Sequence, residues 1–62
     1  MDRQQIRAEI QDLARSQGFY GRLLRDIEEL EQEEPESAEQ FWKDLEDQNF
    51  EDSLDMVLYF ET

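Results

Sequence analysis

The segment from residue 37 to residue 60 constrains the fold most, because its apolar residues cannot all lie on one side of a single helix. It contains five of the seven aromatic residues of the chain. Successive residues of an α-helix are about 100° apart, and two groups of apolar residues then point in almost opposite directions: Phe41 and Leu45 in one group, and Phe50, Leu54 and Val57 in the other. The segment is therefore predicted to break near Gln48–Asn49, with Asn49 as the N-cap of a helix over residues 50–61.

The helices on either side of this break are each predicted to bury one face. Ser37 and Gln40 have the spacing of a capping box, which predicts a helix over residues 38–48. Its inward residues are expected to be Ala38, Phe41, Trp42 and Leu45. The apolar side of the following helix is expected to consist of Leu54, Val57, Leu58 and Phe60. The run from Met56 to Phe60 also has residues that favour strands, but no other segment offers a partner strand, so a helix is predicted.

The first half of the chain predicts two further amphipathic helices. Residues 2–17 have apolar residues at helical spacing, and Gly18 follows as the expected C-cap. The apolar residues of this first helix are Ile6, Ile10, Leu13 and Ala14. Residues 19–32 form the second predicted helix, with one stripe at Phe19, Leu23, Ile27 and Leu30 that Tyr20 and Leu24 widen.

Residues 28–36, EELEQEEPE, contain six acids and the only proline of the chain. Pro35 disfavours helical backbone at residue 34, so the second helix is predicted to end around Glu31–Glu33. Blocks of like charge are usually solvated or disordered. The rest of this acidic run is therefore expected to be a solvated connector.

Together these segments predict an all-α fold, a small bundle of three to four short helices. Sixty-two residues allow a single domain, residues 1–62, with one small core, and Trp42 is expected near its centre. The absence of cysteine fits a reducing compartment, and a cytoplasmic protein is expected. No basic and apolar leader and no long apolar run occur, so neither a signal peptide nor a membrane span is predicted.

The net charge of −12 is concentrated in the second part of the chain. Residues 1–25 have a balance of +2, whereas residues 26–62 have fifteen acids against Lys43 alone and a balance of −14. Binding to a phosphate backbone or to an anionic membrane requires a surplus of Lys and Arg. We therefore expect no direct contact with nucleic acid or membrane, and a basic protein surface as the partner.

The residue types that carry most enzymatic chemistry are missing. The chain has no histidine and no cysteine, so its serines lack a histidine that would activate them. Glycosidase-type catalysis by two carboxylates requires a cleft that raises the pKa of one of them, and short helices leave little room for such a cleft. No enzymatic activity and no cofactor are predicted.

A calcium loop of the EF-hand type requires Gly at its sixth position and Glu at its twelfth. Starting at Asp47, these positions are Asp52 and Leu58. Starting at Asp44, they are Asn49 and Asp55. Neither register fits, and no dedicated metal site is predicted.

The acidic side of the last two predicted helices is the candidate binding surface. Six carboxylates are expected to contact a partner there: Glu39, Glu46, Asp47, Glu51, Asp52 and Asp55. Carboxylates one helical turn apart are separated by about 6 Å, comparable with the phosphate spacing along a DNA strand. The net charge also exceeds the magnitude of about 2–8 that is typical of a small soluble domain. Two interpretations stay open, namely mimicry of nucleic acid and a surface that only keeps the protein in solution.

Two stretches carry a resemblance to known proteins: SQGFYGRLLRDI (residues 16–27) and QNFEDSLDMVLYFE (residues 48–61). In these stretches the chain resembles short acidic proteins encoded on phage and mobile elements. In size and charge it is similar to anti-CRISPR and anti-restriction proteins that mimic DNA. The resemblance implies inhibition of a defence enzyme at its basic nucleic-acid-binding site, and it carries over no individual residue.

The alternative interpretation is a small helical regulatory or dimerisation module. Such a module docks through exposed apolar residues, either on a helical groove of a partner or on a second copy of the chain as a homodimer. The residues expected to be exposed for this purpose are Tyr20, Leu24, Met56 and Tyr59.

Overall fold

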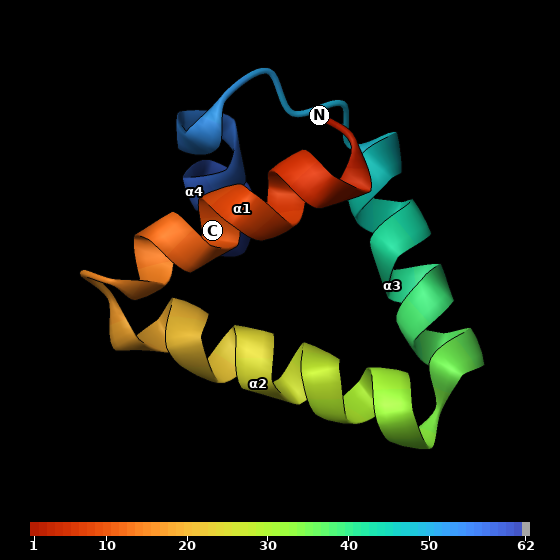
Figure 1. The fold of residues 1–62 in the computed structure, drawn as a ribbon. Coiled ribbons are helices and arrows are strands. Elements are labelled where there is room, and N and C mark those ends of the chain that lie inside the picture. The colour runs from red at the N-terminus through yellow and green to blue at the C-terminus, as the bar shows by residue number, and fades with distance from the viewer. Residues whose placement is uncertain (62) are drawn as a thin grey trace.

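Four helices account for most of residues 1–61, which are the residues that the computed structural model describes. They are α1 (Arg3–Ala14), α2 (Gly18–Glu33), α3 (Pro35–Asp47) and α4 (Ser53–Glu61). In Figure 1, α1, α2 and α3 form the three sides of a triangle, and α4 lies behind α1 in this view. The prediction of an all-α bundle is confirmed. None of these helices within residues 1–61 is long and apolar enough to cross a membrane.

The start of α1 has a side-chain cap, whereas its connection to α2 differs from the prediction. Asp2 is the N-cap of α1, because its side chain accepts a hydrogen bond from the Gln5 amide at 2.9 Å. At the other end, the Arg15 amide donates back to the Asp12 carbonyl at 3.2 Å. Gly18 is the first residue of α2 and does not have a positive φ. The expected role of Gly18 as a C-cap is therefore wrong, since α1 ends without a left-handed residue.

α2 ends at Glu33, as predicted, but the rest of the acidic run is not a connector of several residues, because α3 already begins at Pro35. Glu34 alone separates α2 from α3, with φ −139° and ψ 72°. Pro35 occupies the first position of α3, where a missing amide proton costs no helical hydrogen bond. Ser37 consequently lies inside the first turn of α3, and the predicted capping box at Ser37 is also wrong.

The predicted break between the last two helices is confirmed, but its caps are different. Asn49 has a φ of 54° and follows the C-cap of α3 in the left-handed conformation, which asparagine tolerates better than most residues. The N-cap of α4 is Asp52, whose Oδ1 accepts from the Asp55 amide at 3.1 Å. Asn49 therefore ends one helix and does not cap the next.

The core contains aromatic and aliphatic residues from all four helices. Trp42 is 1% exposed, which confirms its predicted place in the core. The buried cluster comprises Ile6, Ile10, Tyr20, Ile27, Trp42, Leu45, Phe50 and Met56. Phe41 is only half-buried and packs against this cluster.

Three residues that were predicted to face inward are exposed instead. Phe19 is exposed because its neighbour Tyr20 takes the inward position and packs edge-on against Phe60, with ring centroids 6.0 Å apart. Leu54 and Leu58 are exposed because the buried side of α4 is centred on Met56.

Candidate protein-interaction surface

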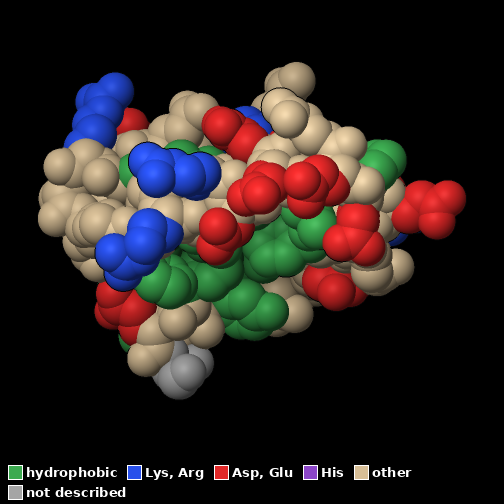
Figure 2. All heavy atoms as spheres, turned by 90° about the horizontal axis from the view of Figure 1, so that it is seen from below, with side chains coloured by type: hydrophobic (Ala, Val, Ile, Leu, Met, Phe, Trp, Pro, Cys, Tyr) green, Lys and Arg blue, Asp and Glu red, His purple; other side chains and the backbone are tan. Residues whose placement is uncertain are grey.

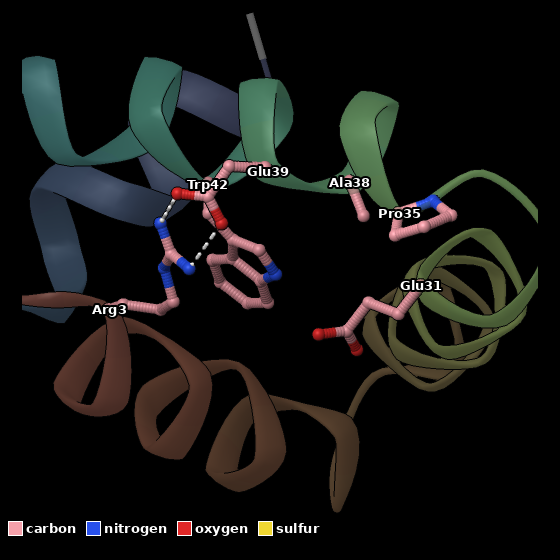
Figure 3. A pocket seen from close by; sticks show the side chains of 6 residues that line it. All are labelled: Arg3, Glu31, Pro35, Ala38, Glu39 and Trp42. Atoms are coloured by element: carbon pink, nitrogen blue, oxygen red, sulfur yellow. Dashed lines mark hydrogen bonds and ion pairs between the residues drawn. The ribbon is translucent and has the colours of Figure 1, made fainter.

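Arg3 binds two of the six carboxylates that were predicted to contact a partner. Its Nη1 and Nη2 donate to the two oxygens of Glu39 at 2.7 and 2.9 Å, as the dashed lines in Figure 3 show. Its Nε donates to Oε1 of Glu46 at 2.9 Å. The hydrogen bond from Arg3 lowers the pKa of Glu39, and the bonds to Glu39 and Glu46 raise the pKa of Arg3. Glu39 and Glu46 therefore join α3 to α1, and Arg3 compensates part of their charge.

Arg7 and Arg3 both lie over the ring of Trp42, and Arg7 adds a second connection between helices. Its Cζ lies 4.7 Å from the centroid of the Trp42 ring, within the range of a cation–π contact, and the Cζ of Arg3 lies at 6.0 Å. The Nη2 of Arg7 also donates to Oε2 of Glu31 at 2.9 Å. The two arginines thus fix α1 against α2 and α3 over the face of one buried ring.

A pocket of about 190 Å³ lies beside Trp42. Its lining consists of Arg3, Glu31, Pro35, Ala38, Glu39 and Trp42. In Figure 3 the indole nitrogen of Trp42 points to the side where Glu31 and Pro35 lie, and this buried Nε1 has no hydrogen-bond partner among residues 1–61. Both carboxylates of the pocket accept hydrogen bonds from an arginine. Because Arg3 lowers the pKa of Glu39, that carboxyl is poorly suited to act as a general acid near neutral pH.

The other four predicted carboxylates lie around the connection between α3 and α4, and they divide into two pairs. Asp52 caps α4 by accepting from the Asp55 amide, and Oδ2 of Asp55, inside α4, accepts from the Glu51 amide at 3.0 Å. Asp47 and Glu51 are exposed, and their carboxylates have no hydrogen-bonded or ion-paired partner within residues 1–61. These two are therefore the predicted contacts that a partner can engage without disturbing an internal bond.

A second group of carboxylates was not predicted as a site. It lies at the corner between α2 and α3, and all its members are exposed and lack an ion pair within the part of the chain that the structure describes: Glu28, Glu29, Glu33, Glu34 and Glu36. We call this group the α2–α3 corner. Its charge was visible in the sequence, but the end of the acidic run was expected to be a solvated connector, whereas Glu36 lies in the first turn of α3 and only Glu34 lies outside a helix. Within residues 1–61, no three carboxylates are grouped as a metal site would require.

The apolar residues proposed for docking are only partly exposed. Tyr20 and Met56 are fully buried, which contradicts their predicted exposure, and Leu24 is half-buried. Leu54 and Leu58 are instead the most exposed large apolar side chains, at 62% and 56%. Figure 2 shows a band of hydrophobic side chains, seen from the side on which α2 lies in Figure 1, with carboxylates along much of its border and Lys or Arg side chains at its left end.

Comparisons with protein families, with curated proteins and with solved structures found no match to the chain.

Proposed function

We propose that the protein is an acidic binding protein that occupies the basic nucleic-acid-binding site of another protein and thereby inhibits it. Defence enzymes such as CRISPR effectors and restriction nucleases are the class of target that its size and charge suggest. The observation that carries this proposal is the excess of uncompensated charge. Only four of the eighteen carboxylates, Asp12, Glu31, Glu39 and Glu46, have an ion-pair partner within residues 1–61.

The density of this charge is comparable with that of a nucleic acid. The longest dimension of the molecule is 29 Å, and its net charge is −12. Duplex DNA of the same length carries about 17 charges, and a single strand carries about 9. A basic groove would therefore meet a field of similar strength on this protein, and the field would accelerate association.

The exposed carboxylates lie near both ends of α3. The α2–α3 corner lies at the start of α3, with Glu36 in its first turn, and Asp47 and Glu51 lie at its far end. A helix of thirteen residues is about 20 Å long. A basic site that spans this distance would contact both groups at once, whereas a compact cationic spot would contact only one.

The test is competition with fluorescent duplex DNA for a panel of CRISPR effectors and restriction nucleases. Asp47→Lys/Glu51→Lys and Glu33→Lys/Glu36→Lys each reverse two charges at one end of α3. We expect each to weaken competition by at least about tenfold, equivalent to about 1.4 kcal/mol, and to keep the melting temperature. Raising the salt concentration should weaken wild-type competition steeply.

The matched control is Asp12→Lys/Asp26→Lys, which makes the same change in net charge elsewhere on the surface. If this control weakens competition as much as the other two variants, the effect reflects net charge alone and not a defined surface. Undiminished competition by both reversed proteins, with folding intact, would refute the proposal.

A further inference from the structure

The helix α4 is apolar on almost every side, although only one side packs against the rest of the chain. Six of its nine residues are apolar, and only Ser53, Asp55 and Glu61 are polar. Met56 is fully buried in the core, and Val57 and Phe60 are half-buried against it. A surface helix normally has polar residues on its outer face, whereas a helix that is apolar all round is normally covered on all sides. The outer face of α4 therefore has the composition of a buried surface.

Leu54 and Leu58 form the centre of this outer face. They are one helical turn apart and lie next to each other on the helix surface. Both are more than half exposed. Side chains at this spacing form a ridge that fits between the side chains of a second helix. A nine-residue helix is about 13 Å long, which matches about two and a half turns of such a partner.

The charges around these leucines indicate what covers them. Glu51, Asp52, Asp55 and Glu61 surround them in sequence, and residues 44–61 contain no Lys or Arg. A second copy of the chain would bring the same carboxylates against these, and like charges across an interface are unfavourable. An anionic membrane surface is disfavoured for the same reason. A helix with apolar residues on one face and Lys or Arg along its borders is complementary in both respects.

We propose that the outer face of α4, centred on Leu54 and Leu58, is a docking site for a basic amphipathic helix of a partner protein. This inference rests on the proposed function only in taking the partner to be basic. The docking site adds an apolar contact to the contacts made by carboxylates, which alone would make binding sensitive to salt. The inference also names the structural element of the partner that binds.

The test uses a fluorescein-labelled Lys/Leu peptide of about 14 residues, a common helix length, with its leucines on one helical face. A scrambled peptide of the same composition is the control for charge. We expect the amphipathic peptide to bind the wild-type protein, and the scrambled peptide to bind at least about tenfold more weakly, as measured by fluorescence anisotropy. The preference should persist at high salt, because an apolar contact is not screened.

On the protein side, Leu54→Gln/Leu58→Gln removes the apolar anchor without changing the net charge. We expect it to weaken binding of the amphipathic peptide at least about tenfold, while Ala8→Gln on the exposed side of α1 leaves binding unchanged. If the double variant does not fold, amide chemical shifts of the wild-type protein decide the question. Addition of the peptide should then shift the amides of α4 more than those of the α2–α3 corner.

Equal binding of both peptides would overturn the proposal, and so would amide shifts confined to the α2–α3 corner, because either result means attraction by charge alone. A dimer in sedimentation equilibrium that the double variant abolishes would also overturn it, since the occupant would be a second copy. None of these measurements involves DNA. Failure of the competition experiment with intact peptide binding would reject the proposed function and leave this site in place.

Discussion

The buried hydroxyl of Tyr20 should make the protein less stable than its phenylalanine variant. Tyr20 is fully buried, and its hydroxyl has no hydrogen-bond partner among residues 1–61. Its ring packs edge-on against Phe19 and Phe60, with centroid distances of 5.1 and 6.0 Å. Phenylalanine keeps both ring contacts and removes only the oxygen. Tyr20→Phe is therefore expected to raise the free energy of unfolding.

The size of this effect follows from two opposing contributions. A buried hydroxyl without a partner costs about 1–3 kcal/mol. The void that the lost oxygen leaves is smaller than the volume of about 30 Å³ that a water molecule occupies. At about 24 cal/mol per Å³, such a void costs less than about 0.7 kcal/mol. The variant should be more stable by about 1 kcal/mol, which raises the melting temperature of a domain of this size by about 4–8 °C.

Urea unfolding followed by the fluorescence of Trp42, the only tryptophan, measures this difference. Phe19→Tyr is the control, because it adds a hydroxyl to a neighbouring ring that is 44% exposed. The control should change stability by no more than about 0.5 kcal/mol. A Tyr20→Phe variant that loses 1 kcal/mol or more, as estimated for a lost hydrogen bond, would show that the hydroxyl has a partner and would refute the reasoning.

Alkaline pH provides a second readout for the same residue. Burial raises the pKa of Tyr20, and the negative charge of Glu61 raises it further. The unfolded chain releases the phenolic proton near its ordinary pKa of about 10, while the folded protein still holds it. Stability should therefore fall as the pH rises above about 10 and through the raised pKa. Tyr20→Phe should remove this part of the decline.

Four further changes test the packing of the core, the helix ends and the ion pair between Arg3 and Glu39. Trp42→Ala should cost about 3–5 kcal/mol and unfold the protein, as circular dichroism would show; an unchanged melting temperature would place the ring outside the core. Asp52→Ala should cost about 1 kcal/mol by removing the cap of α4, whereas Asp47→Ala makes the same charge change and should stay within about 0.5 kcal/mol in urea unfolding. Asn49→Val should cost about 1–2 kcal/mol in the left-handed conformation, and Asn49→Gly should cost nothing. Because Arg3 lowers the pKa of Glu39, the Glu39 carboxylate stabilises the folded protein at pH values above its ordinary pKa of about 4.3, and this stability is lost as the pH falls through the lowered pKa. Glu39→Gln should therefore reduce the loss of stability in acid, as measured by urea unfolding midpoints over a series of pH values.

The first three helices were predictable because each has one apolar stripe at helical spacing. That spacing directly predicts the buried stripe of α1 at Ile6 and Ile10. It also predicts the central position of Trp42 in α3. Helix ends were less predictable. Pro35 and Asn49 each fit more than one role near a terminus, and the backbone conformation of the neighbouring residues decided between these roles.

The network around Arg3 was not predictable from periodicity. Arg3 is 36 residues from Glu39 and 43 residues from Glu46 in the sequence. Only the crossing of α1 and α3 brings these charges together. Two of the six candidate contacts consequently have an ion-pair partner inside the protein, and two more, Asp52 and Asp55, accept backbone hydrogen bonds at the start of α4. The sequence contained one signal for the caps, because Asp52 and Asp55 have the spacing of an N-cap and its third helical residue.

The helix α4 shows why an apolar pattern can be correct about the type of an element and wrong about its orientation. A helix with a polar side reveals its inward face, whereas α4 has apolar residues on all sides and offers several inward faces of similar hydrophobicity. Met56 packs against the remainder of the core, and Leu54 and Leu58 are therefore exposed to solvent. A nine-residue helix is too short to be stable alone in water, so its contacts with the core and its cap at Asp52 hold it in place. A partner helix that covered the opposite side would bury the remaining leucines, and the same absence of a polar face that prevented prediction of its orientation would then serve binding.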